Sequence, residues 1–380
     1  MVYCKKTSEI SMHQIDMLIK PASGLCNMRC KYCFYADVTD NREVKSYGLM
    51  SAETQQTLIQ KALSYADGYC NFAFQGGEPT LAGLDFFRRQ VQLQKQYNVN
   101  SVIVTNSIQT NGLAIDEEWA KFLADNHFLV GLSLDGPKEI HDSLRPDAAQ
   151  NGTFDRIMET VKLFNRYKVD YNILTVISKP VAQNAKQVYS FFRSCNFKYL
   201  QFIECLDPFD AQARDYSLTA KDYENFLKVT FDEYYRDFQR GNYISVRTFD
   251  NYIMMLMGKR PESCGMSGVC TAYNLVEANG NVYPCDFYVL DKYLLGNLHT
   301  HTFEDFASSD VAKNFVKESL HVDSACRRCK WYKLCRGGCK RCREPFVNGR
   351  PGLNRFCEAY KGFFKYAYPK MEQMARMLSK

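Results

Sequence analysis

The chain has 380 residues, of which 46% are hydrophobic and 24% charged, and a net charge of +6. This balance is ordinary for a globular protein of two or three domains, and the scattered, mild positive charge does not predict nucleic-acid binding. There is no run of about 18 apolar residues that would span a membrane. The N-terminus also lacks the apolar core of a secretory signal, so we expect a cytoplasmic protein. In a reducing compartment, the 16 cysteines are expected to bind metal rather than to form disulfides.

Short apolar runs alternate with longer helical patterns in the first half of the chain. In the segment 51–66, for example, Ser51 and Glu53 precede apolar residues at helical spacing. This alternation predicts βαβ units and a parallel sheet. There are six units, fewer than the eight of a full barrel, so we predict a partial (β/α)6 barrel of the TIM type, with an open doubly wound sheet as the alternative. The predicted strands are 15–21, 70–79, 101–112, 128–137, 171–180 and 199–208.

Three cysteines follow the first predicted strand with the spacing C-x3-C-x2-C: Cys26, Cys30 and Cys33. Thiolates favour zinc or iron–sulfur clusters, and a structural site normally takes four protein ligands. There is no histidine between residues 14 and 126 to complete a zinc site, although His127 or a distant cysteine could fold in. A four-iron cluster on three thiolates leaves one iron open, as in catalytic sites.

Polar residues also follow the later strands. They are Gln75 to Glu78, Gln109 and Asn111, Ser133 and Asp135, and Glu204 and Asp207. The carboxyl ends of barrel strands meet at one face, where such proteins place their chemistry. We therefore predict one shared site, with turn formers and helix caps as the simpler reading.

The pattern changes after about residue 215. Residues 219–258 predict one or two long helices, and cysteines become dense from Cys264 onward. The predicted organisation is a barrel over 1–215, a helical connector over 216–258, and a cysteine-rich domain with a C-terminal helix over 259–380. Residues 326–339 have the spacing C-x2-C-x5-C-x3-C, for which zinc knuckles are a rival interpretation.

The three-cysteine loop resembles that of the radical S-adenosylmethionine superfamily. Phe34 directly follows the third cysteine, and "GGEP" ends the second predicted strand. The resemblance implies that S-adenosylmethionine binds the open iron and that Gly76, Gly77 and Glu78 hold its amino group. Arg145 would suit its carboxylate, because a guanidinium pairs with carboxylates bidentately. The other cofactor-binding residues that the resemblance implies are Phe34, Gln75, Gln109, Ser133 and Leu206.

The C-terminal cysteines resemble a SPASM domain, which holds two auxiliary [4Fe-4S] clusters. This implies three clusters in all. The first auxiliary set would be Cys264, Cys270, Cys285 and Cys339, and the second Cys326, Cys329, Cys335 and Cys357. Cys342 competes with Cys339 as a ligand. The remaining cysteines, Cys4, Cys70, Cys195 and Cys205, are predicted to be mainly buried thiols without a metal role.

A narrower resemblance runs nearly end to end, through "FAFQGGEPTLAG", "GLSLDGPKEIHDSLR" and "YPCDFYVLDKYLLGNL". These segments are similar to the anaerobic sulfatase-maturating enzymes. The resemblance implies oxidation of a Cys or Ser in a C/S-x-P/A-x-R sulfatase motif to Cα-formylglycine, after a 5′-deoxyadenosyl radical removes a Cβ hydrogen. Asp286 would be the general base, and Tyr35 is a weaker candidate for the substrate pocket. The implied partners are the sulfatase polypeptide and an electron donor such as ferredoxin or flavodoxin.

Two other functions stay open. A related peptide maturase could form thioether or carbon–carbon crosslinks, but such enzymes often carry an N-terminal recognition domain. Only about fourteen residues precede the first predicted strand here. A zinc-stabilised interaction protein is the non-enzyme alternative. The sequence does not choose between Cys and Ser as the target residue.

Overall fold

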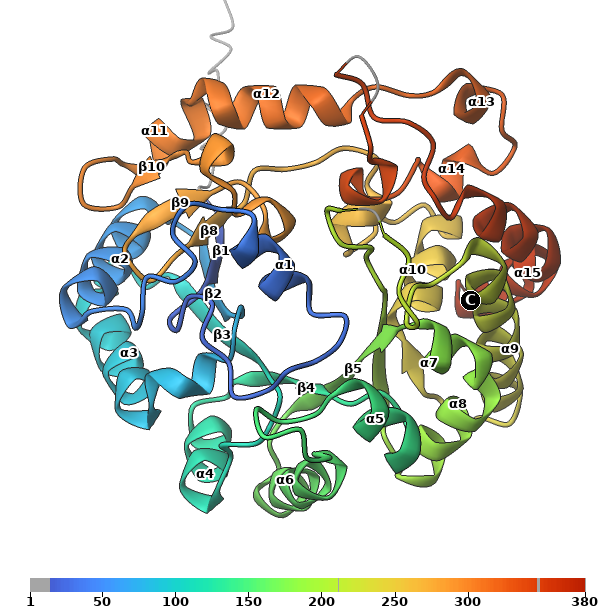
Figure 1. Cartoon of the computed structure of the whole chain (residues 1–380), viewed down its shortest axis with the longest axis horizontal. Coiled ribbons are helices and arrows are strands. Elements are labelled where there is room, and N and C mark those ends of the chain that lie inside the picture. Colours follow the sequence, from blue (N-terminus) through green and yellow to red (C-terminus); the bar gives the residue numbers. More distant parts are fainter. Residues whose placement is uncertain (1–13, 211, 347–348, 380) are drawn as a thin grey trace, which may run out of the picture.

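The computed structural model describes residues 14–210, 212–346 and 349–379. Its centre is a curved ten-stranded sheet in the order β10-β9-β8-β1-β2-β3-β4-β5-β6-β7. The six predicted strands are all present, parallel and in chain order: β1 (Ile15–Ile19), β2 (Tyr69–Phe74), β3 (Ile103–Thr110), β4 (Leu129–Ser133), β5 (Tyr171–Ile177) and β6 (Tyr199–Glu204). Helices surround the sheet on its outer side (Figure 1). The partial barrel is confirmed, and the doubly wound alternative is wrong because such a sheet carries helices on both faces.

The outer helices follow the strands in order. They are α2 (Ala52–Tyr65), α3 (Leu84–Tyr97), α4 (Glu117–Asp125), α5 (Lys138–Leu144), α6 (Phe154–Tyr167), α7 (Lys179–Gln183) and α8 (Ala185–Ser194), while the short α1 (Phe34–Asp40) follows the three-cysteine loop. The predicted start of α2 is confirmed, since Ser51 caps it by accepting a hydrogen bond from the Thr54 amide at 3.0 Å.

The main core lies between the sheet and these helices. Alternate residues of β2 are buried, and Phe74 contacts Phe87 with ring centroids 5.0 Å apart. Side chains on the other face of each strand point into the barrel. The barrel interior is therefore available for a site at the carboxyl ends of the strands.

The C-terminal part continues the barrel sheet. After α9 (Ala220–Gln239), β7 (Ser245–Val246) pairs with β6, and α10 (Arg247–Leu256) follows. At the other edge, β8 (Asn274–Val276) runs parallel to β1, and β9 (Asn281–Tyr283) and β10 (Gly296–Asn297) add antiparallel strands. A buried ion cluster supports the β1–β8 junction, because Glu277 lies 2.9 Å from Lys20 and 2.7 Å from Arg42.

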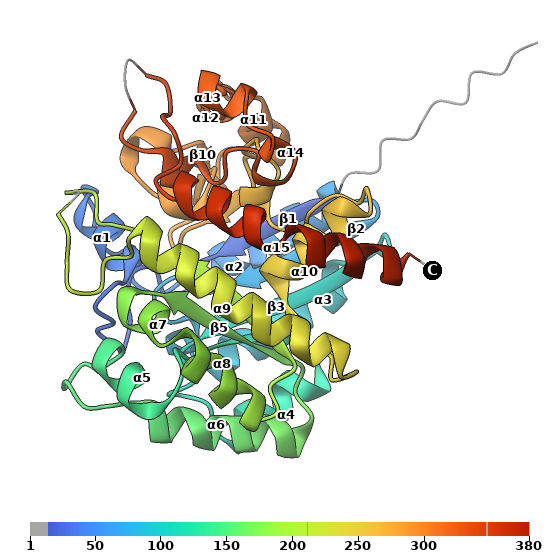
Figure 2. The same ribbon diagram turned by 90° about the vertical axis from the view of Figure 1, so that its right-hand side faces the viewer.

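The remaining helices are α11 (Phe303–Ser308), α12 (Asp310–Ser319), α13 (Ser324–Arg327), α14 (Tyr332–Cys335) and α15 (Cys357–Leu378). The long helix α15 lies along α9 and α10 (Figure 2). Phe363 of α15 packs on Phe231 and Phe249, with ring centroids 5.7 and 5.6 Å away. No helix in the described part of the chain has the length and apolar character needed to cross a bilayer.

Candidate active site and metal sites

A cavity of about 610 Å³ opens at the carboxyl ends of the barrel strands. Cys26, Cys30 and Cys33 line it, and so do all the predicted cofactor-binding residues, which are Phe34, Gln75, Gly76, Gly77, Glu78, Gln109, Ser133, Arg145 and Leu206. Tyr35 lines it as well. The structure thus brings the predicted residues together, and their individual roles stay predictions.

The second glycine of "GGEP" fixes how closely β2 approaches the three-cysteine loop. Gly77 has φ +56°, and a Cβ there would lie 2.3 Å from the carbonyl oxygen of Leu25, the residue before Cys26. The Glu78 amide also donates to this oxygen at 2.8 Å. A side chain at position 77 would therefore push the loop away from the strand.

Glu78 is already well bonded within the protein. One carboxylate oxygen accepts from the Thr80 amide at 3.1 Å and from the Thr80 and Thr110 hydroxyls, both at 2.7 Å. The other accepts from the Asn111 amide at 2.8 Å. Burial raises the pKa of Glu78, and these donors oppose the rise. Glu78 therefore ties the end of β2 to the end of β3, while its predicted contact with an amino group stays untested.

Arg145 is held in place by a residue that the sequence showed only as a strand end. Its Nε lies 2.9 Å from Asp135 Oδ2, and Tyr32 donates its hydroxyl to the same oxygen. The guanidinium Nη1 lies 3.8 Å from the Cys30 sulfur. Asp135 thus orients a cation beside the three-cysteine loop, as a site for an anionic group requires.

Two further predicted residues meet across neighbouring strands. Gln109 of β3 donates to the Ser133 hydroxyl of β4 at 3.1 Å. Gly131 of β4 leaves room for the glutamine, since a Cβ there would lie 2.0 Å from Gln109 Oε1.

Asp286 lies next to the cavity, covered by two of its lining residues. Its Oδ2 accepts from the Tyr35 hydroxyl at 2.8 Å and from Gln75 Nε2 at 3.3 Å. Its buried Oδ1 has no hydrogen-bond partner in the described part of the chain. Burial raises the pKa of Asp286 to about 6, against the opposing effects of Tyr35 and Lys20. Such a carboxylate suits a general base near neutral pH.

Lys20 is the residue near Asp286 that sequence reasoning missed. It is fully buried, and its Nζ lies 5.4 Å from the centroid of the Tyr35 ring. A lysine directly after the apolar run Met17 to Ile19 was the available signal. Its partner Glu277 follows a three-residue strand that the sequence pattern did not show.

Each predicted auxiliary set converges on its own small cavity. Cys264, Cys270, Cys285 and Cys339 line one, and Cys326, Cys329, Cys335 and Cys357 line the other. Cys342 is buried and lines the large cavity instead of the first small one. Of the other thiols, Cys70 and Cys205 are buried and Cys195 is partly buried, while Cys4 lies outside the described residues.

The chemistry and spacing of these thiols fit iron–sulfur clusters. Within the described ranges, no three His, Cys, Asp or Glu side chains are grouped to hold a single metal ion. A tetrahedral zinc, with Zn–S bonds of about 2.3 Å, needs its sulfurs within about 4 Å of one another. Iron–sulfur clusters are held by cysteine thiolates, and the sets of three and four thiols at these cavities fit such ligation.

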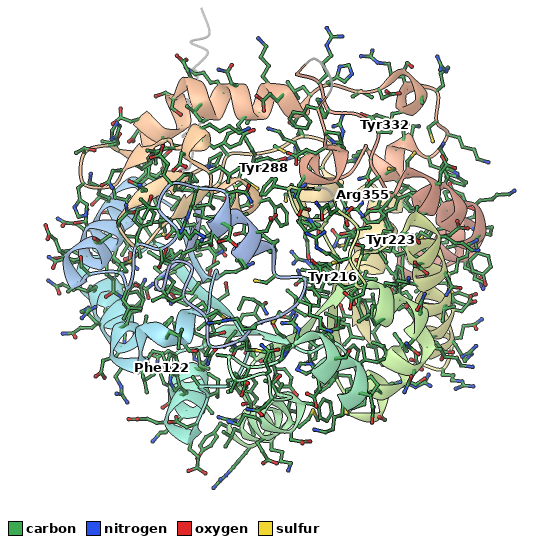
Figure 3. All side chains as sticks on the ribbon, in the orientation of Figure 1. Phe122, Tyr216, Tyr223, Tyr288, Tyr332 and Arg355 are labelled. Atoms are coloured by element: carbon green, nitrogen blue, oxygen red, sulfur yellow. The ribbon has the colours of Figure 1, made fainter. Side chains whose placement is uncertain are left out.

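The two parts of the chain also meet at polar contacts near the cavity. Arg355 forms an ion pair with Asp207, and its Nη2 donates to the Leu218 carbonyl at 3.2 Å. Tyr360 of α15 donates to Glu204 at 2.7 Å, and Tyr223 of α9 donates to the same carboxylate at 2.7 Å. Figure 3 shows Arg355 and Tyr223 at this junction. The loop after β6 is therefore attached to the cysteine-rich part.

Comparisons with known proteins agree with this arrangement. A model of the radical SAM superfamily matches residues 21–190, and a model of the SPASM iron–sulfur cluster-binding domain matches residues 269–330. The chain is 48% identical to a cysteine-type anaerobic sulfatase-maturating enzyme of Clostridium novyi, over 97% of this chain and 99% of the relative. It is 28% identical to a serine-type enzyme of Bacteroides thetaiotaomicron, over 95% and 91% of the two chains.

A solved structure is similar over nearly its whole length. Native anSMEcpe with bound AdoMet and the Cp18Cys peptide superimposes with a TM-score of 0.93 at 46% identity. The match covers 96% of this chain and all of that chain.

Proposed function

The chain belongs to the anaerobic sulfatase-maturating enzymes, which are radical SAM enzymes with a SPASM domain, and on that premise we propose that it acts on the cysteine of a sulfatase motif. The family reaction converts a Cys or Ser to Cα-formylglycine. The preference for Cys is supported by the cysteine-type relatives, which are 47–48% identical to this chain, whereas the serine-type relatives are 28% identical.

The cofactors are [4Fe-4S] clusters and S-adenosylmethionine, and the donor set of the chain fits them. Cys26, Cys30 and Cys33 would hold the cluster that faces the large cavity. This cluster and S-adenosylmethionine together supply hydrogen-atom abstraction at the substrate Cβ. In this proposal Arg145 pairs with the carboxylate of the cofactor, which is supported by the contact through which Asp135 orients its guanidinium.

Asp286 takes the thiol proton of the target cysteine in this proposal. Tyr35 and Gln75 hold one carboxylate oxygen and leave Oδ1 for the substrate. A pKa near 6 keeps the carboxylate mostly ionised at neutral pH and still basic enough to accept a proton. The hydrogen-bonded group of Asp286, Tyr35 and Gln75, which lies beside the cavity of the three cysteines, is the observation that carries the proposal.

The substrate is an extended segment of a sulfatase with a C/S-x-P/A-x-R motif. Oxidation removes two electrons and two protons from the cysteine side chain and leaves a thioaldehyde, which water converts to the aldehyde with loss of hydrogen sulfide. An electron-carrier protein such as ferredoxin or flavodoxin exchanges electrons with the enzyme.

The test uses anaerobically reconstituted protein with S-adenosylmethionine and dithionite. Two peptides, Cys-x-Pro-x-Arg and Ser-x-Pro-x-Arg, are followed by mass spectrometry together with 5′-deoxyadenosine. We expect the mass of the Cys peptide to change by the difference between a thiol and an aldehyde, and that of the Ser peptide to change by two hydrogens. The Cys peptide should react faster. Deoxyadenosine without either change would move the substrate to another peptide.

The role of Asp286 is tested with Asp286→Asn. We expect this variant to form deoxyadenosine but to lose at least about 100-fold in peptide oxidation, the usual effect of removing a general base. The matched control is Asp291→Asn, an exposed carboxylate five residues on that accepts from the Glu43 amide at 2.9 Å. Oxidation by Asp286→Asn at the wild-type rate would contradict the assignment.

A further inference from the structure

The segment 324–343 concentrates positive charge around the second auxiliary cysteine set. It contains eight Lys and Arg residues and no Asp or Glu. The whole chain has 48 basic and 42 acidic residues, so without this segment its net charge would be negative. The positive charge of the chain is therefore concentrated in the segment 324–343.

Three of the basic residues are used inside the fold. Lys340 is buried and lies 2.5 Å from Glu318. Arg341 donates to the Asp207 carbonyl at 2.9 Å, and Arg343 donates to the Gly352 carbonyl at 3.2 Å. These three attach the segment to its surroundings, and a fourth, the half-buried Arg336, donates to the Lys333 carbonyl at 3.3 Å.

Four others are exposed and have no carboxylate partner in the described part of the chain: Arg327, Arg328, Lys330 and Lys333, which we call the basic rim. The Arg327 Nε contacts the Val322 carbonyl at 3.3 Å, and the Lys330 Nζ lies 4.7 Å from the Trp331 ring centroid. Neither contact neutralises charge. The structure therefore leaves four cations for a partner.

The basic rim alternates with metal ligands along the chain. Arg327 and Arg328 lie between Cys326 and Cys329, and Lys330 and Lys333 lie between Cys329 and Cys335. Helices α13 and α14 carry this segment at the outer edge of the molecule, and Tyr332 lies there, away from the centre of the barrel (Figures 1 and 3). No residue of the rim lines the large cavity. The rim therefore surrounds the second auxiliary site and not the peptide site.

We propose that the basic rim docks a small acidic one-electron carrier protein beside the second auxiliary site. The inference rests on the proposed function. Of the two electrons removed from each substrate cysteine, one leaves with the Cβ hydrogen atom. The carrier accepts the second and is reduced by one electron, while the thiol proton goes to Asp286. Electron-transfer encounters use small interfaces and charge steering, and four unpaired cations provide such steering.

A nucleic acid is the rival partner for a basic surface. Binding of single strands usually adds aromatic side chains on which bases stack. The Trp331 ring instead packs on Phe364 and Tyr368 of α15, with centroids 5.9 and 5.3 Å away. The position of the rim around a metal site also favours an electron carrier.

The test measures binding of an acidic bacterial ferredoxin with two [4Fe-4S] clusters to the reconstituted holoenzyme by calorimetry. We expect R327E/R328E and K330E/K333E each to weaken binding by about tenfold or more at low salt. The matched control is K121E/K186E on α4 and α8, two exposed lysines without an ion pair in the described ranges, which should bind as the wild type does. High salt should weaken wild-type binding and reduce the differences between variants.

Iron content shows whether each variant retains its clusters. The salt dependence of ferredoxin binding to the wild type tests charge steering without any variant. Rim variants that keep their iron and bind ferredoxin as tightly as the wild type would overturn the proposal. So would a single-stranded oligonucleotide that binds the rim and displaces ferredoxin. Dithionite-driven peptide oxidation by the wild type tests the proposed function separately, so the two can fail independently.

Discussion

Gly77 controls the approach between β2 and the three-cysteine loop at the scale of a single residue. A Cβ at this position would meet the backbone oxygens of Leu25 and Ser23, at 2.3 and 2.9 Å, which cannot move as a side-chain end can. We expect Gly77→Ala to displace the loop and to lose about four of about twelve irons per chain, measured by iron analysis after anaerobic reconstitution.

Gly241→Ala is the matched control. Gly241 has φ +70° and no atom within 4 Å of a built Cβ. It carries the same cost of about 1 kcal/mol for a left-handed alanine, without the clash. Full iron in both variants would show that the loop does not depend on close approach at Gly77.

His141 makes stability depend on pH. It is fully buried, its Nδ1 accepts from the Asp135 amide at 3.2 Å, and burial lowers its pKa to about 4. Because the unfolded chain binds a proton first as the pH falls, stability is complete above about pH 6.5 and is lost toward pH 4. We expect His141 to contribute a loss of about 2 kcal/mol in the free energy of unfolding by pH 5, measured by anaerobic denaturation as the difference in pH dependence between the wild type and a variant without this histidine.

His141→Gln should remove this part of the pH dependence, although it costs stability at all pH values. His299→Gln, at an exposed position, should keep it. If the free energy of unfolding changed equally with pH in the wild type and in His141→Gln between pH 7 and pH 5, the assignment of this pH dependence to His141 would be contradicted.

The sequence predicted which residues gather at the site but not how they pair. Strand ends were enough to place Gln75, Gln109 and Ser133 around one cavity, whereas Arg145 was predicted only from the family resemblance. The bond from Gln75 to Asp286 joins residues 211 positions apart, so no local pattern contains it. Asp135 was predicted to belong to the shared site, but its pairing with Arg145 and Tyr32 was not predicted, because only the fold brings these residues close to it.

At the scale of elements, the junction of β1 and β8 depends on one buried carboxylate. Burial opposes ionisation of Glu277, but Lys20 and Arg42 outweigh it and lower its pKa. Glu277→Gln leaves two buried cations without a charged partner, and we expect it to cost about 3 kcal/mol of unfolding free energy. Glu159→Gln, which breaks an exposed pair with Lys162, should cost less than about 0.5 kcal/mol.

Denaturation of the two variants under the same anaerobic conditions checks this difference. A change for Glu277→Gln as small as that for Glu159→Gln would mean that strand pairing alone holds the junction.

The six barrel strands, of five to eight residues, were predictable, whereas β7 to β10 have two or three residues and show no periodicity. Tertiary pairing, not local propensity, forms them.

At the scale of the whole molecule, the large cavity lies between the barrel and the cysteine-rich part, since residues such as Gln109 and Cys264 line it together. A target residue must therefore enter on a flexible segment. We expect a short Cys-x-Pro-x-Arg peptide or an unfolded sulfatase to be oxidised, and the same sulfatase to be a poor substrate once folded. Parallel assays of the folded, unfolded and peptide forms by mass spectrometry check this.

A folded, unmodified sulfatase that is oxidised as fast as the peptide would contradict the entry of an extended segment. A redox-inactive sulfatase with Ala at the target position is the control, because it should compete with the peptide only when unfolded.

Helix α15 has a consequence for how the protein is made. Its first residue, Cys357, completes the second auxiliary set, and its apolar face packs on α9 and α10 through residues as late as Met374. During translation, Cys326, Cys329 and Cys335 leave the ribosome well before this helix can dock. Cluster delivery to the second site must then wait until α15 has been synthesised, and a ribosome that stalls within the last helix would leave three thiols open to oxidation.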